Sequence, residues 1–133
     1  MDYRERFERG IAEFNEHLFF ECHDTLEALW MEERGERRRF LQGVIQGAVG
    51  IFHASRRNFN GAESQLSRSI EKLAGYPPTF LGVDVASLRN GLDAFRDSIR
   101  EYTAKGSLDY DPLLIPTIAY TYDPESMPGS VID

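Results

Sequence analysis

Apolar residues recur every three to four positions through the first hundred residues of the chain. This spacing is typical of amphipathic helices that bury one face. It predicts a first helix capped by Asp2 with Glu5, a second from about Leu18 to Glu33, a central one over residues 40–57, a fourth capped by Asn60 with Glu63, and a fifth capped by Asp84. Gly35 is expected to end the second helix and Gly75 the fourth, and no strand-length alternation of apolar and polar residues occurs before residue 106. We therefore expect an all-α bundle of about five helices.

The central segment, FLQGVIQGAVGIFHASRR, is apolar on almost every side. A helix of this kind belongs in the middle of its domain, so we expect it to be the most buried element. Gly43, Gly47 and Gly50 fall on one side of it. Because a glycine inside a helix costs about 1 kcal/mol relative to alanine, three on one side indicate that a neighbouring helix packs closely there.

From Gly106 onward the composition changes. Four of the six prolines lie here and helical periodicity stops. The sequence thus predicts one bundle domain over residues 1–105 and an extended, proline-containing tail over residues 106–133. The tail is too apolar for a disordered segment, and we expect it to lie across the bundle or across a second subunit, ordered to at least Tyr120 and frayed from about Glu125. Its apolar residues are Leu113, Leu114, Ile115, Ile118, Tyr120 and Tyr122.

Charge and cysteine content narrow the possible partners. The 133 residues carry a net charge of −7, which argues against nucleic acid as the main partner. The arginines around residues 34–39 are either a solvated face paired with nearby glutamates or an anion site. Cys22 is the single cysteine and is expected in the core. Neither a signal peptide nor a membrane span is recognisable, so we expect a cytoplasmic protein.

Candidate chemistry comes from polar residues on two apolar helices. Gln42, Gln46 and His53 lie within about 40° of one another on the central helix, where we expect Gln46 and His53 to be largely inaccessible. His23 and Glu27 share a face of the second helix. If these two helices pack antiparallel, His23, Glu27 and His53 converge. Two histidines with one carboxylate are a ligand set for iron, zinc or manganese, so a divalent metal is the candidate cofactor.

The same residues also fit a purely structural role. Buried histidine and glutamate side chains often satisfy each other and nearby glutamines, and such a network fixes helix register without a ligand. Asp24 and Glu21 turn away from His23 on the helix, and His17 belongs to a loop. Phe19, Trp30 and Phe52 read as core residues. The sequence is compatible with both a metal site and a structural polar network.

Three segments in succession resemble a known family. FNEHLFFECHDTLEALW, RRFLQGVIQGAVGIFHASRRNFNGAESQL and YPPTFLGVDVASL together resemble the small helical proteins of domain of unknown function 309, over about residues 7–100. The resemblance implies a helical bundle and the predicted activity of a metal-dependent hydrolase. It places the family's motif positions at Glu21, His23, Glu27, Trp30, Gln42, Gln46, His53, Asn58, Gly61 and Ala62.

Two functions follow from these observations. In the first, the chain is a metal-dependent hydrolase in which His23, Glu27 and His53 hold a divalent ion that activates water, while Gln42 or Gln46 orients water or substrate. In the second, it is a non-catalytic interaction or scaffold module, a homodimer, whose polar cluster is structural and whose glycine face or tail makes the contact.

Overall fold

The computed structural model describes residues 2–128, and within them the chain is an all-α bundle, as predicted. The long elements are α1 (Tyr3–Asn15), α2 (Phe19–Glu32), α3 (Gly35–Ser55), α4 (Phe59–Ala74) and α5 (Val85–Ala104). Two short strands, β1 (Thr79–Phe80) and β2 (Val83–Asp84), pair antiparallel between α4 and α5. A 3-10 turn, η1 (Pro112–Leu114), follows α5. Over residues 2–128 no helix is both long and apolar enough to span a membrane.

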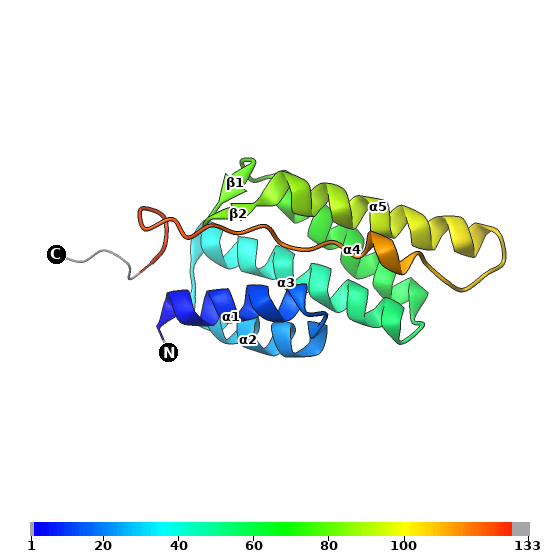
Figure 1. Ribbon diagram of the computed structural model, residues 1–133, viewed down its shortest axis with the longest axis horizontal. Helices are drawn as coiled ribbons and strands as arrows, with labels where there is room; N and C mark the ends of the chain where they lie inside the picture. Colours follow the sequence, from blue (N-terminus) through cyan, green and yellow to red (C-terminus); the bar gives the residue numbers. More distant parts are fainter. Residues whose placement is uncertain (1, 129–133) are drawn as a thin grey trace.

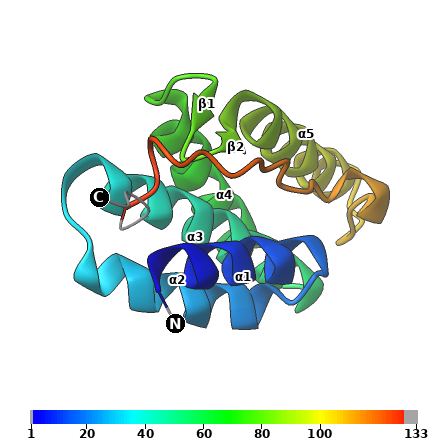
Figure 2. The same cartoon turned by 60° about the vertical axis from the view of Figure 1, so that its left-hand side comes forward.

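Helix α3 holds the central place in the bundle. It packs against α2 on one flank and α4 on the other, while α1 packs on α2 and α5 packs on α4. The tail then runs between α1 and α5 across α3 (Figures 1 and 2). The buried side chains of α3 include Phe40, Leu41, Ala48, Ile51 and Ala54. The apolar segment thus forms the middle of the core, as expected.

The close approach of α3 and α4 confirms the interpretation of the three glycines. A Cβ atom on Gly50 would lie 2.7 Å from Leu66 Cγ and 3.1 Å from the Leu66 backbone nitrogen. On Gly47 it would lie 3.1 Å from Ser69 Oγ. The Ser69 hydroxyl also donates a 2.6 Å hydrogen bond to the Gly43 carbonyl. Glycine lets the two backbones approach until α4 side chains rest directly on α3.

Helix boundaries agree with the sequence except in two places. Asp2 and Asp84 cap α1 and α5, accepting hydrogen bonds from the Glu5 and Ser87 amides. For α4 the expected cap, Asn60, is wrong: Asn58 is the cap and accepts from the Gly61 amide at 3.0 Å. Helix α3 also begins earlier than predicted, at Gly35. Its arginine-rich first turns are therefore helical.

The short hairpin was not predicted, because two-residue strands leave no alternating pattern. Its turn has positive φ at both central residues, +50° at Leu81 and +79° at Gly82, the arrangement that tight two-residue hairpins favour. The Gly82 carbonyl accepts a hydrogen bond from the Thr121 amide at 2.8 Å. A Cβ on Gly82 would lie 2.1 Å from the Thr121 carbonyl oxygen, so only glycine permits this contact with the tail.

The tail is fastened to α1 and to the hairpin by polar contacts. Asn15 donates to the Ile118 carbonyl at 3.0 Å and accepts from the Ile118 amide at 2.7 Å. The Tyr120 hydroxyl donates to Glu8 at 2.7 Å. This hydrogen bond, together with Arg4, holds the pKa of Glu8 below its usual value. Residues 118–121 are thus held to the bundle by side chains of α1 and by the backbone of the hairpin.

Two parts of the tail differ from the expected pattern. Fraying from Glu125 is wrong for the described part of that segment, since Met127 is only 2% exposed and packs in the core; residues 129–133 lie outside the described residues. In contrast, Leu113 is 90% exposed and Leu114 is 39% exposed. These two side chains do not cover the bundle of their own chain.

We expect Gly50→Ala to lower the free energy of unfolding by about 1 to 3 kcal/mol, because the added methyl overpacks the α3–α4 contact against backbone as well as side chain. Gly75→Ala is the matched control, since a Cβ there meets only the Lys72 carbonyl oxygen at 3.5 Å. Urea unfolding of both variants measures the difference. An unchanged Gly50→Ala midpoint would contradict the close-packing account.

We expect Asn15→Ala to destabilise the protein by about 1 to 3 kcal/mol, because it leaves the amide and carbonyl of buried Ile118 without their partner. Asn90→Ala, at an exposed position of α5, is the control. Thermal unfolding measures the loss of stability, and limited proteolysis measures the release of the tail. The tail of Asn15→Ala should be cut faster than that of the control, and equal cutting would show that Asn15 does not hold it.

Candidate functional site

The polar residues of α3 form a stripe about 100° around the helix from the glycine face. Gln42, Gln46 and His53 are all only partly buried. Gln46 and His53 are therefore less completely buried than the core side chains of the same helix. An apolar sequence placed α3 in the core, but its two flanking helices leave this stripe in contact with solvent. Its residues can reach both a binding partner and the neighbouring helices.

Helix α4 and its cap residue supply partners for Gln46 and His53 of this stripe. Lys72 Nζ donates to Gln46 Oε1 at 3.0 Å, and Asn58 Nδ2 lies 3.5 Å from His53 Nδ1. Sequence reasoning missed Lys72. The three glycines on one side of α3 could have indicated it. Gly50 packs against Leu66 and Gly43 against Leu73, and this antiparallel packing brings Lys72 near Gln46.

His23 interacts within its own helix, α2. Its Nε2 atom lies 2.9 Å from Glu27 Oε2 and its Nδ1 atom lies 3.2 Å from Asp24 Oδ1. Both ring nitrogens can donate to these carboxylates only when the imidazole is protonated. The His23 side chain is 30% exposed and that of Glu27 is 47% exposed. Asp24, considered the weaker candidate from helix geometry, thus contacts His23 after all.

The expected metal set is not assembled. Within residues 2–128 no group of three or more His, Cys, Asp or Glu side chains is arranged to hold a metal ion. His53 faces Asn58, while His23 faces carboxylates of its own helix. Between the two helices, the rings of Phe20 and Phe52 meet with centroids 5.7 Å apart. Aromatic packing therefore occupies the α2–α3 contact where we expected the imidazoles to converge.

Cys22 and the arginine cluster take structural roles. Burial raises the pKa of the Cys22 thiol to about 12, so it is neither a ready nucleophile nor a ready metal ligand. Burial also tends to raise the pKa of Glu33, but hydrogen bonds from Arg37 and from the Arg34 amide outweigh it and hold this pKa below its usual value. Arg38 stacks on Trp30 at 4.0 Å. These contacts favour the ion-paired surface over an anion site.

An apolar hollow, here called the end hollow, opens where α2 begins and α3 ends. Its volume is about 420 Å³. The expected core residue Phe19 is 7% exposed, whereas Phe20 is 53% exposed. Its apolar lining comes from Leu18, Phe19, Phe20, Ile51, Phe52, Tyr110, Pro112 and Ile115, with His17, Glu21 and Ser55 as polar members. The end hollow has no signature in the sequence, because it forms only where the tail turn closes one side.

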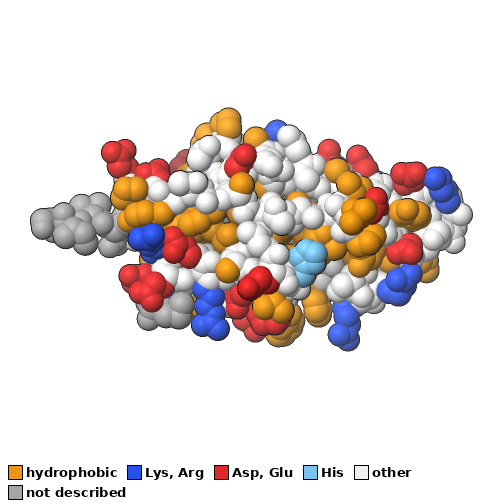
Figure 3. Space-filling model, viewed as in Figure 1, with side chains coloured by type: hydrophobic (Ala, Val, Ile, Leu, Met, Phe, Trp, Pro, Cys, Tyr) orange, Lys and Arg blue, Asp and Glu red, His pale blue; other side chains and the backbone are white. Residues whose placement is uncertain are grey.

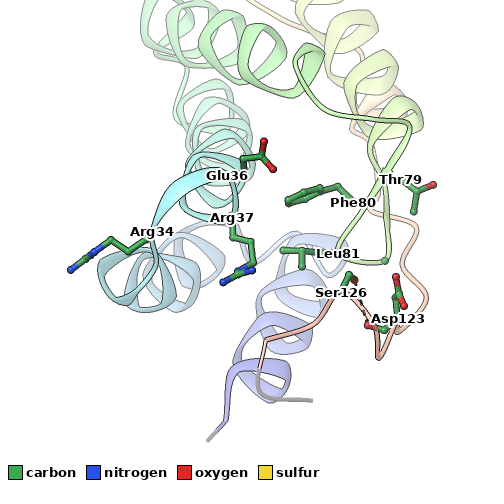
Figure 4. Close-up of a pocket in the computed structure, with 9 residues that line it drawn as sticks. Arg34, Glu36, Arg37, Thr79, Phe80, Leu81, Asp123 and Ser126 are labelled. Carbon is green, nitrogen blue, oxygen red and sulfur yellow. Dashed lines mark hydrogen bonds between the residues drawn. The ribbon is translucent and has the colours of Figure 1, made fainter. Parts of the chain in front are cut away.

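A second hollow, of about 390 Å³, lies at the opposite end of the bundle. Figure 4 shows Phe80 and Arg37 pointing toward it, while Arg34 points away. Asp123 and Ser126 of the tail line its other side. Arg37 is already paired with Glu33 at 2.8 Å, and the candidate metal ligands His23, Glu27 and His53 are not part of this lining. The hollow therefore offers a mixed, largely self-neutralised surface.

Comparison with known proteins gives a family but no activity. Residues 7–65 match the family described as Domain of unknown function (DUF309). The Uncharacterized protein YpuF of Bacillus subtilis (strain 168) is 32% identical over 93 residues, which is 68% of this chain and 53% of that protein. The chain thus spans about half the length of this curated relative. The matched segment contains most of α1, all of α2 and α3 and the start of α4, and over these residues the chain is similar to the DUF309 family.

Proposed function

We propose that this chain is a non-catalytic helical interaction module that associates with a second copy of itself, acting in the cytoplasm. The observation that carries the proposal is the pairing of the polar residues. Gln46 is bound by Lys72, His53 faces Asn58, and His23 lies against Glu27. The contacts of Gln46 and His53 with Lys72 and Asn58 fix α3 against α4, and the His23–Glu27 pair is satisfied within α2, so none of these three residues needs a ligand to be stable.

The tail is the better candidate for the contact between copies. The glycine face is filled by Leu66, Ser69 and Leu73 of α4, which leaves no room there for a second chain. Around the end hollow, in contrast, Leu18, Phe20 and Leu113 are strongly exposed. Large apolar side chains grouped on a surface are typical of protein contacts.

We expect the purified chain to have twice its monomer mass of 15.2 kDa at micromolar concentration. Light scattering after size exclusion, over a hundredfold range of concentration, measures this. Treatment with a chelator is the control and should leave mass and melting temperature unchanged, because the proposed association requires no metal ion. A monomer throughout the range would contradict the proposal.

A metal-dependent hydrolase is the second candidate function. Its support is the 2.9 Å approach of His23 to Glu27 at a partly exposed position, together with the family resemblance. His23 and Glu27 are the residues that would begin such a site. His53, the expected third ligand, faces Asn58 instead, so we derive no reaction step from it.

Glu27→Gln separates the two functions, because it keeps the side-chain shape but removes the charge that a divalent ion requires. Under the proposed function we expect no bound zinc or manganese by elemental analysis of wild type, and at most a modest loss of stability in the variant. Glu63→Gln, a carboxylate of α4 paired with Arg100, is the control. Stoichiometric metal that wild type and Glu63→Gln retain and Glu27→Gln loses would support the hydrolase instead.

A further inference from the structure

We propose that two copies of this chain contact each other reciprocally at the end hollow, with Leu113 of each copy seated in the end hollow of the other. This inference rests on the proposed self-association and names the surface that makes it. Figure 3 shows hydrophobic side chains along the face that carries the tail, in its right half as well as at its left end.

Leu113 is presented on a well-supported turn. It is the middle residue of η1 (Pro112–Leu114), and its amide donates to the Asp111 carboxylate at 3.0 Å. The Asp111 amide in turn donates to Ser98 of α5 at 2.7 Å, and Arg57 at the end of α3 donates to the Leu108 carbonyl. The turn is thus tied to both α3 and α5, yet Leu113 is 90% exposed. A leucine held in this way is already ordered for contact and loses little freedom on binding.

The end hollow has the size and lining that a leucine side chain requires. Its volume of about 420 Å³ exceeds that of one aliphatic side chain, and its walls are mainly aromatic and aliphatic. Phe20 and Phe52 meet on its rim with ring centroids 5.7 Å apart. An apolar side chain that enters would also shield the exposed part of Phe20 from water, and apolar burial is the main driving force of association.

Reciprocal contact is possible because Leu113 and the end hollow are neighbours on the surface. Pro112 and Ile115, which flank the exposed pair in the turn, both line the end hollow. In a two-fold contact the same surface meets itself, so each copy must carry both complementary features side by side. A chain with the leucine at one end and the hollow at the other would form head-to-tail rings or open filaments instead.

Charges on this surface favour a second copy despite the net charge of −7. Asp109 and Asp111 flank the turn, and Arg56 lies beside Phe52, with its guanidinium 5.7 Å from the ring centroid. Entry of Leu113 beside Phe52 would bring the acidic turn of one copy toward Arg56 of the other. Glu21, His17 and Tyr110 are the titratable residues of the lining. Opposite charges set side by side reduce the repulsion between two acidic chains.

Substitution of Leu113 and of Phe20 tests the contact. We expect Leu113→Asp and Phe20→Asp each to raise the dimer dissociation constant by at least about tenfold in analytical ultracentrifugation, as loss of a central apolar contact does. Met31→Asp is the matched control, since Met31 is 66% exposed on α2 outside the end hollow, and its dissociation constant should stay unchanged. Circular dichroism checks that all three variants remain folded.

The outcomes separate this inference from the proposed function. A wild-type dimer whose dissociation constant is unaffected by Leu113→Asp and Phe20→Asp would overturn the contact and leave self-association standing. A monomeric wild type would overturn both. If Met31→Asp weakens the dimer as strongly as the other two, the contact lies elsewhere on α2 and the end hollow is wrong.

Cross-linking between differently tagged copies tests the reciprocal geometry directly. We expect Leu113→Cys in one copy and Ser55→Cys in the other to form a mixed disulfide when the two proteins are combined, because Ser55 lines the end hollow. Native Cys22 is fully buried and does not interfere. Leu113→Cys mixed with Met31→Cys is the control. Equal mixed-disulfide yields in both combinations would overturn the contact.

Discussion

The close contact between α3 and α4 is the constraint on which the rest of the molecule depends. Gly43, Gly47 and Gly50 remove the side chains that would hold the helices apart, and Leu66, Ser69 and Leu73 take their place. Three glycines lower helix propensity, so α3 is stable because of its packing rather than its intrinsic preference. The short distance also decides which α4 side chains reach the polar stripe. A wider spacing would leave Gln46 beyond the reach of Lys72.

This geometry explains why polar residues occur on an otherwise apolar helix. Once α3 is fixed against α4, its stripe faces the edge of the helix layer, where Lys72 and Asn58 provide partners. On the α2 side, Phe20 and Phe52 take the contact, and His23 turns to carboxylates of its own helix. The pairs between α3 and α4 disfavour a shifted register, because a slip would separate Gln46 from Lys72 and His53 from Asn58.

Helical periodicity predicted the five helices, because it depends only on which face each helix buries. Capping by Asp2 and Asp84 was equally readable, since a cap acts within one turn. The α4 cap was wrong because Asn58 and Asn60 both offer a suitable side chain, and the choice depends on Phe59 entering the core. Convergence of His23 with His53 failed for a similar reason. It required the rotation of α2 against α3, which Phe20 and Phe52 determine.

The two ends of the bundle differ in how completely the tail covers them. At the hairpin end, Tyr120 pairs with Val83 and Met127 enters the core, so the tail buries the apolar residues it meets. At the other end it is held just as firmly, through Asp111 and Ser98, but turns Leu113 outward beside the end hollow. A loosely held segment could bury such a leucine by a small movement. A turn fixed at both sides cannot, so the exposed leucine and the hollow can be covered together only by another molecule.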